Sequence, residues 1–155
     1  MRIKQYVFLP LLFIVGMSLL LISCEKATDN QQTIDDQIIS SYLTKNKLKA
    51  TKTNSGLYYI ITQQGLGKQV TNNSTLYVKY KGYLSDSTVF DENTTGTSIS
   101  LNSVITGWQE GLTYFNVGGK GKLFIPSHLA YGKNVNGKVP ANSVLFFDIE
   151  VLEIQ

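Results

Sequence analysis

Residues 75–84 of the chain read TLYVKYKGYL, and this stretch decides the fold class. Apolar and polar side chains alternate along it with a period of two, which is typical of a β-strand that has one face on a core and the other in water. The core face would carry Leu76, Val78, Tyr80 and Leu84, and the solvent face would carry Tyr77, Lys79, Lys81 and Tyr83. Comparable patterns predict further strands over 55–62, 120–126 and 143–152.

The rest of the chain adds helices and loops to these strands. In VITGWQEGLTYF (104–115) the apolar residues recur at helical spacing, and a shorter helix is predicted over 33–48. The stretch 85–98 is interpreted as a loop that leads into a short extended piece around Ile99. Because strands and helices do not alternate, the pattern predicts the α+β class, with an antiparallel sheet of four or five strands that curls over one central helix.

The first part of the chain has the composition of an export signal. Arg2 and Lys4 precede the apolar run YVFLPLLFIVGMSLLLIS, which has about the length of a secretory signal and is slightly short for a membrane span. The run LISC (21–24) resembles a bacterial lipobox, so we expect cleavage before Cys24 and acylation of its thiol. Two alternatives stay open: a signal anchor, and a cysteine that lies near a cleavage site by chance.

These features predict four segments. They are a lipoprotein signal peptide (1–23), a flexible polar tether (24–32), a short N-terminal helix with a linker (33–54) and the main domain (55–155). Several acyl chains would give a stable anchor where one would be marginal. We therefore expect a protein of the bacterial cell envelope that is lipid-anchored to a membrane, with its domain in the periplasm or at the cell surface.

Charge and composition exclude several other classes of function. Beyond residue 23 the chain holds 12 basic and 11 acidic side chains, which gives no electrostatic case for a nucleic-acid partner. The single cysteine rules out an internal disulfide framework and a thiolate-clustered metal site. The only histidine, His128, is interpreted as a solvated loop residue. Asp35 and Asp36 are interpreted as early-helix charges that complement the helix dipole.

Four blocks of sequence carry a family resemblance. They are VKYKGYLSDSTVFDEN (78–93), VITGWQEGL (104–112), GGKGKLFIPSHLAYG (118–132) and VPANSVLFFDIEVLEI (139–154). Their order and spacing resemble those of an FKBP-type peptidyl-prolyl cis-trans isomerase, over roughly residues 55–155. The resemblance implies that family's fold, a twisted antiparallel sheet of about five strands half-wrapped around the short helix that carries Trp108.

The same resemblance implies an aromatic pocket for a prolyl ring, with Trp108 as its floor. The expected catalytic residues are Asp91, Tyr131, Trp108 and Phe147. The expected substrate-binding residues are Tyr80, Phe90, Ile99, Val104, Ile105 and Val139. Ile105 would offer its backbone N–H to a substrate carbonyl, and Asp91 and the Tyr131 hydroxyl would be polar groups at the rim. Without the resemblance, the sequence pattern alone favours core packing for Tyr80, Trp108 and Phe147.

The activity implied is isomerisation of X–Pro bonds by non-covalent stabilisation of the twisted imide, without a cofactor or a metal. The implied partners are proline-containing unfolded or loop segments of exported or envelope proteins. Two alternatives stay open at this point. One is a low-activity module that binds proline peptides, and the other is an envelope scaffold whose working surface is the strand face of Tyr77 and Tyr83.

The chain also departs from the family's pattern. The resemblance implies an arginine that often supports the pocket acid and tyrosine, but Arg2 is the only arginine of the chain and lies in the signal segment. A lysine or plain hydrogen bonds must therefore support the pocket acid. Thr97-Ser98-Ile99 stands where many members carry aromatic residues, which makes that wall less aromatic. The loop GKNVNGKV is too short for the inserted flap of some bacterial relatives, and the helix at 33–48 is too short for a dimerising stalk, so we expect a monomer.

Overall fold

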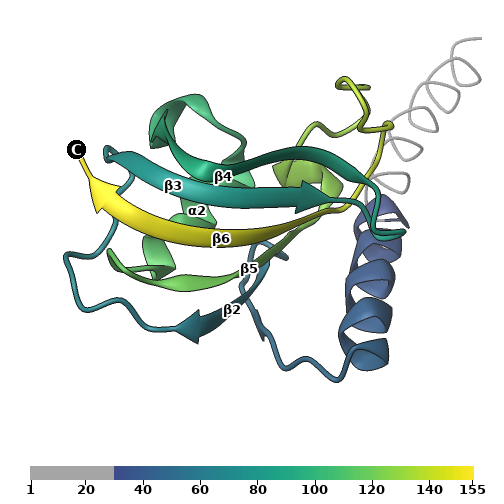
Figure 1. The fold of residues 1–155 in the computed structure, drawn as a ribbon. Helices are drawn as coiled ribbons and strands as arrows, with labels where there is room; N and C mark the ends of the chain where they lie inside the picture. Colours follow the sequence, from purple (N-terminus) through teal and green to yellow (C-terminus); the bar gives the residue numbers. More distant parts are fainter. Residues whose placement is uncertain (1–29) are drawn as a thin grey trace, which may run out of the picture.

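A computed structural model describes residues 30–155 of the chain. Its sheet has six antiparallel strands in the order β1-β2-β5-β6-β3-β4 (Figure 1). The strands are β1 (Thr51–Lys52), β2 (Tyr58–Gln63), β3 (Thr75–Tyr83), β4 (Val89–Ser100), β5 (Lys120–Ile125) and β6 (Leu145–Ile154). The helical elements are an N-terminal helix over 30–45, η1 (Leu101–Ser103), α2 (Thr106–Gly111), η2 (Leu112–Tyr114) and η3 (Ser127–Leu129).

This architecture confirms the predicted α+β class. The strands predicted over 55–62, 75–84, 120–126 and 143–152 are β2, β3, β5 and β6, with ends that differ by a few residues. The helix predicted over 104–115 is α2 followed by η2, and it begins after two residues of extended backbone. The sheet has six strands where about five were expected, because the two-residue β1 joins its edge.

The interpretation of 85–98 as a loop is wrong, because most of this stretch belongs to β4. This 12-residue strand lies at the edge of the sheet and pairs only with β3. None of its residues is fully buried, so its sequence lacks the apolar alternation that identifies a strand. A shift of register opposite Val78 and Tyr80 interrupts the pairing, and near it the Asn93 side-chain oxygen accepts a hydrogen bond from the Gly96 N–H at 2.7 Å.

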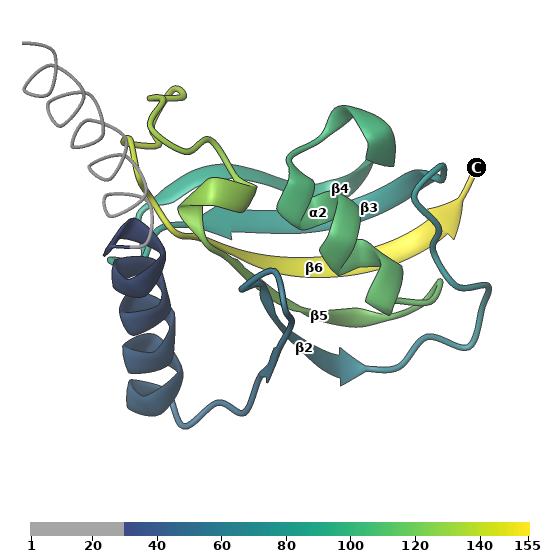
Figure 2. The same ribbon diagram turned by 180° about the vertical axis from the view of Figure 1, so that it is seen from behind.

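The main core lies on the face of the sheet that α2 and η2 cover, here called the inner face (Figure 2). Gly107 and Gly111 are one helical turn apart and both point at β5. A Cβ atom added to Gly107 would lie 2.3 Å from Ile125, and one added to Gly111 would lie 2.6 Å from Leu123. The two glycines therefore allow the helix backbone to approach the strand closely, which presses Trp108 against the sheet.

A second core lies on the opposite face, here called the outer face. Tyr58, Phe124, Phe146 and Tyr83 are neighbours in register across β2, β5, β6 and β3, and form one aromatic row. The N-terminal helix covers this row with Ile39, which is fully buried, and with its neighbours one turn away. The prediction that Tyr83 faces water is thus wrong, since the helix covers this end of the face, whereas Lys81 on the same strand is exposed.

Two acids fix the helix to the sheet by different contacts. Asp35 was interpreted as an early-helix charge that complements the helix dipole. It lies in the second turn of a helix that begins at residue 30, is fully buried, and accepts hydrogen bonds from the N–H and the hydroxyl of Ser127, so its role is a tertiary contact. Asp36 is paired with Lys52 and accepts a hydrogen bond from the Tyr58 hydroxyl at 2.6 Å. The helix thus contacts the sheet through the apolar side chains around Ile39 and through the bonds of Asp35 and Asp36. These contacts make the helix part of the folded domain.

The predicted segment boundaries change accordingly. Residues 30–32, assigned above to the tether, are already helical. The helix and β1, which were assigned to a separate segment of helix and linker (33–54), pack against the rest of the domain. The signal peptide, most of the tether and Cys24 lie outside the described residues. Within residues 30–155, no helix has the length and apolar character needed to cross a membrane.

Replacing Ile39 tests whether the helix belongs to the cooperative unit. Ile39→Ala leaves a void under the aromatic row, and we expect it to lower the free energy of unfolding by about 2–4 kcal/mol. Gln37→Ala on the exposed side of the same helix serves as the control and should change it by less than about 0.5 kcal/mol. Urea unfolding measures both. Equal midpoints for the two variants would mean that the helix does not stabilise the domain.

Candidate active site

The site is built around Trp108, which α2 presses against the inner face of the sheet and which is 4% exposed. The indole meets Tyr80 of β3 and Phe147 of β6 edge to face, with ring centroids 5.3 and 5.2 Å apart. Phe147 meets Phe90 of β4 in the same way at 5.5 Å. Edge-to-face contacts are a preferred geometry of aromatic pairs, so the four rings support one another.

These rings border an open cavity of about 260 Å³. It is lined by Tyr80, Phe90, Asp91, Ile99, Ser103, Val104, Ile105, Trp108, Tyr131 and Phe147. The lining comes from β3, β4, β6, the start of α2 and the segment after η3, which are far apart in the sequence. We call this hollow the aromatic cavity. It can hold a compact apolar group of a ligand against the indole of Trp108, while the polar atoms next to that group contact Asp91 and Tyr131.

Asp91 is the acidic group of the aromatic cavity. Its carboxylate accepts a hydrogen bond from the Tyr80 hydroxyl at 2.8 Å. Burial, and then this bond to the Asp91 carboxylate, raise the pKa of Tyr80 to about 12. Burial and the charge of Asp91 also raise the pKa of Tyr131. Both phenols therefore keep their protons at neutral pH and can act as hydrogen-bond donors. Residues 30–155 contain no arginine, so the Tyr80 hydroxyl supports the Asp91 carboxylate in its place.

The backbone at the start of α2 supplies a further donor. Ile105 is the N-cap residue of this helix, with extended backbone angles (φ −58°, ψ 148°), and its carbonyl accepts the N–H of Trp108 at 2.9 Å. The first N–H groups of a helix have no acceptor within the helix. The Val104 carbonyl is in turn fixed by the side-chain amide of Gln109 at 2.8 Å. These two bonds fix the peptide groups of Val104 and Ile105, and with them the Ile105 N–H, beside the indole.

The structure brings together nearly all of the residues expected from the family resemblance. Asp91, Tyr131, Trp108, Phe147, Tyr80, Phe90, Ile99, Val104 and Ile105 all line the aromatic cavity. Val139 does not: it is 3% exposed and packs in the inner-face core. The expectation that Val139 binds substrate is therefore not supported by its position, because its side chain is used in packing.

Two positions of the site were missed in the sequence. Ser103, at the end of η1, lines the cavity but carries no motif that would single it out. Gly82 lies in β3 beneath two rings, since a Cβ atom there would be 2.6 Å from Phe90 and 2.8 Å from Phe147. An isolated glycine within a strand is a known sign of close approach, so the sequence did hold a signal for Gly82.

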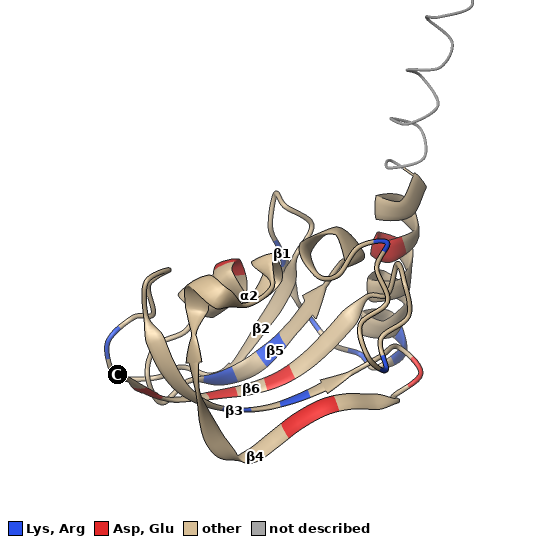
Figure 3. Ribbon diagram, turned by 90° about the horizontal axis from the view of Figure 1, so that it is seen from above, with Lys and Arg blue, Asp and Glu red and all other residues tan. Residues whose placement is uncertain are grey.

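A larger hollow of about 350 Å³ lies over the outer face, away from Trp108. Among its charged lining residues, Lys122 pairs with Asp148 and Lys120 pairs with Glu150 at 3.1 Å, while Lys79 and Lys81 also line it. In Figure 3 the basic and acidic positions of β5, β6, β3 and β4 lie side by side across the sheet. Paired, solvent-exposed charges of this kind contribute little to binding or stability. The smaller aromatic cavity is therefore the better candidate for an active site, despite its lower volume.

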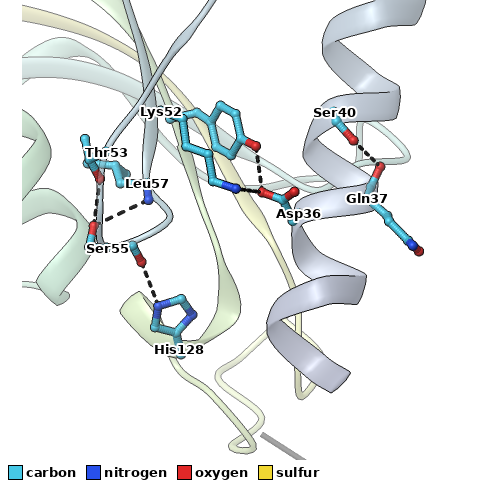
Figure 4. A network of polar contacts seen from close by, with 9 residues as sticks. Asp36, Gln37, Ser40, Lys52, Thr53, Ser55, Leu57 and His128 are labelled. Carbon is cyan, nitrogen blue, oxygen red and sulfur yellow. Dashed lines mark hydrogen bonds and ion pairs between the residues drawn. The ribbon is translucent and has the colours of Figure 1, made fainter. Parts of the chain in front are cut away.

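His128 is exposed, as expected, but it belongs to η3 rather than to a loop and has a partner. Its Nε2 atom lies 3.0 Å from the Ser55 carbonyl oxygen (Figure 4). The Ser55 hydroxyl donates to Glu110 of α2 at 2.6 Å. These contacts tie η3 and α2 to the turn before β2, and His128 thus has a structural contact outside the aromatic cavity.

The pKa of Tyr80 predicts a pH effect that Tyr80→Phe should reveal. Because the pKa of Tyr80 in the folded chain exceeds its ordinary value of 10.0, its contribution to stability is fully present below about pH 10 and is lost as the pH rises toward about 12. The free energy of unfolding of the wild type should therefore approach that of Tyr80→Phe over this window, measured by urea unfolding at each pH. A difference that stays constant or grows would contradict the assignment.

Comparison with known proteins agrees with this geometry. The FKBP-type peptidyl-prolyl cis-trans isomerase family matches residues 67–152. The chain is 50% identical over 109 residues to the isomerase FkpA of Buchnera aphidicola subsp. Schizaphis graminum, covering 68% of this chain and 43% of that protein. It is 44% identical over 113 residues to FkpA of Escherichia coli K12, covering 70% and 42%. The chain thus spans less than half the length of these relatives.

Solved structures agree with the sequence relatives. The crystal structure of FkpA from Escherichia coli has a TM-score of 0.71 at 31% identity, covering 98% of this chain and 75% of that chain. A peptidyl-prolyl cis-trans isomerase from Pseudomonas syringae pv. tomato has a TM-score of 0.70 at 27% identity, covering 83% and 96%. The fold, the aromatic cavity and the family match over more than half of the sequence lead to one conclusion: the chain belongs to the FKBP-type peptidyl-prolyl cis-trans isomerase family.

Proposed function

We propose that this chain catalyses cis–trans isomerisation of X–Pro bonds, with the aromatic cavity as its active site. The observation that carries the proposal is the cavity of about 260 Å³ that is bordered by Trp108 and contains one acid, Asp91. The family match over residues 67–152 supports the same activity. The proposed substrates are proline-containing unfolded or loop segments of exported proteins.

Rotation about an X–Pro bond needs no covalent chemistry. Amide resonance sets a barrier of about 18–20 kcal/mol, so the spontaneous reaction takes tens to hundreds of seconds. At the twisted midpoint the nitrogen loses conjugation and the carbonyl becomes more ketone-like. An aromatic cavity that encloses the prolyl ring and displaces water from it favours this midpoint over either planar isomer. A barrier lower by roughly 5–7 kcal/mol would raise the rate by about four to five decades.

The polar groups of the aromatic cavity have distinct roles in this mechanism. The backbone N–H of Ile105 would donate a hydrogen bond to a substrate carbonyl oxygen and so hold the peptide on one side of the rotating bond. The Tyr131 hydroxyl, protonated because burial raises its pKa, is a second donor. Asp91, oriented by the Tyr80 hydroxyl, would interact electrostatically with the imide as it twists.

Asp91→Ala tests this role of the acid. We expect a loss of roughly ten- to hundredfold in kcat/KM, because preorganised electrostatic groups in an enclosed site contribute on this scale. The rate is measured on short proline peptides in a protease-free isomerisation assay, and the fold is checked by circular dichroism. Glu92→Ala is the matched control, since Glu92 is the next residue of β4 and pairs in register with Lys81. Equal rates for the two variants would remove Asp91 from the mechanism.

The same assay separates the enzyme from a binding module. A module that only holds proline peptides would retain peptide affinity while giving the uncatalysed rate, and substitution of Trp108 would then lower affinity alone. The scaffold alternative is weakened by the burial of Tyr83, which is 8% exposed and packs beneath the N-terminal helix. Tyr83 is therefore not available to a partner, which leaves Tyr77, partly exposed, as the one remaining tyrosine of that proposed surface.

The lipobox-like run before Cys24 supports a further part of the proposal, that the protein is lipid-anchored in the cell envelope. The short N-terminal helix, too short for a dimerising stalk, supports a monomer. When the full chain is expressed in a bacterium fed with radioactive fatty acid, we expect label on the wild type and none on Cys24→Ala. Label that is absent from both, or equal in both, would overturn the assignment of Cys24 as the lipidated residue.

A further inference from the structure

Asp35 is a buried acid that the proposed mechanism does not use. It lies on the N-terminal helix, before the family match at residues 67–152, and its exposed fraction is 0%. One carboxylate oxygen accepts from the N–H of Ser127 at 2.8 Å and from its hydroxyl at 2.6 Å. The other accepts from the side-chain amide of Gln31 at 2.7 Å. A carboxylate that is fully desolvated and bound to three donors fixes the groups around it.

Ser127, which Asp35 holds in place, in turn holds the backbone on both sides of Tyr131. Its carbonyl oxygen accepts two backbone hydrogen bonds, from the N–H of Ala130 at 3.0 Å and from the N–H of Gly132 at 2.9 Å. These two residues flank Tyr131, whose side chain lines the aromatic cavity. The hydrogen-bond path therefore runs from Asp35 through Ser127 to both peptide neighbours of Tyr131.

The segment after β5 needs an anchor from outside. Pro126, the residue before η3, provides no side-chain cap for the first N–H groups. The backbone then leaves the helical region at Ala130 (φ −118°, ψ −120°) and takes a positive φ of 58° at Gly132. A helix start is usually capped by its own Ser, Thr, Asp or Asn. Here the cap comes from Asp35, 92 residues away in the chain.

We propose that Asp35 is a positioning residue for the isomerase reaction, acting through Ser127 on Tyr131. This inference rests on the proposed function. It assigns to the N-terminal helix, which precedes the family match, a role in setting the geometry of the aromatic cavity. When the Asp35 bonds are lost, Ser127 can move, and its carbonyl no longer holds the N–H groups of Ala130 and Gly132 in one place. The Tyr131 hydroxyl then no longer has one fixed position at the cavity.

The neighbouring acid provides a matched control. Asp36 also fixes the helix, through Lys52, as Figure 4 shows. It accepts a second contact from the Tyr58 hydroxyl. These contacts go to β1 and β2 and do not involve Ser127 or η3. Removing either carboxylate weakens the docking of the helix, but only removal of Asp35 releases the segment that carries Tyr131.

The experiment compares Asp35→Ala, Asp36→Ala and Asp35→Asn in the full-length protein, solubilised in mild detergent. After correction for the folded fraction, Asp35→Ala should lower kcat/KM by about five- to tenfold, and Asp36→Ala by less than about twofold. Asp35→Asn should restore the rate, because both Ser127 bonds go to one oxygen, which the amide can supply, and the Gln31 amide can turn to accept from the new NH2 group.

Hydrogen–deuterium exchange of a peptide that includes Gly132 gives a readout without substrate. Asp35→Ala should accelerate exchange there by about tenfold, with Asp36→Ala and Asp35→Asn near the wild type. If Asp35→Ala does not fold, Ser127→Ala replaces it, and we expect a two- to threefold loss of kcat/KM, roughly in line with one lost hydrogen bond, and faster exchange.

The outcomes distinguish the two claims. An active wild type with Asp35→Ala equal to Asp36→Ala in both rate and exchange would overturn the positioning role alone. If Ser127→Ala is the variant used, an unchanged rate and unchanged exchange would do the same. An inactive wild type would overturn the proposed function, and this role with it.

Discussion

The alternation of side chains along β6 is the constraint on which the rest of the structure depends. Phe146 and Phe147 are adjacent in the sequence, and successive side chains of a strand point to opposite faces of the sheet. Phe147 borders the aromatic cavity on the inner face, and Phe146 belongs to the aromatic row under the N-terminal helix on the outer face. A shift of register by one residue would exchange the two, and both the cavity wall and the helix contact would be lost.

The two faces of the sheet are therefore not independent. The outer core fixes the N-terminal helix, and the helix carries Asp35 to Ser127 beside the segment of the active site that contains Tyr131. The inner core fixes α2 through the close approach of Gly107 to Ile125, and this places Trp108 at the cavity. In this way packing on both faces holds a site whose own residues make few polar contacts with one another.

The chemistry of the site follows from its aromatic lining and its few polar groups. The aromatic rings meet edge to face, Asp91 is held by Tyr80, and the tyrosines at the cavity keep their protons at neutral pH. On the outer face, by contrast, Lys120 pairs with Glu150 and Lys122 with Asp148 around the charged hollow. This separation leaves the aromatic cavity suited to an apolar ring and a polarised carbonyl.

The sequence by itself determined the strands with a buried face and the Trp-bearing helix, because burial on one side leaves a periodic pattern of apolar residues. The resemblance to the family supplied nine of the ten cavity residues. Eight of them lie within the four blocks of sequence that carry the resemblance, and Ile99 lies between the first two blocks. Only the tertiary structure decided the edge strand β4, the burial of Tyr83 and Asp35, and the position of Val139 in the core. Each of these depends on contacts between segments far apart in the chain. The spacing of residues along the chain does not indicate which distant element will pack against a given strand edge, sheet face or carboxylate.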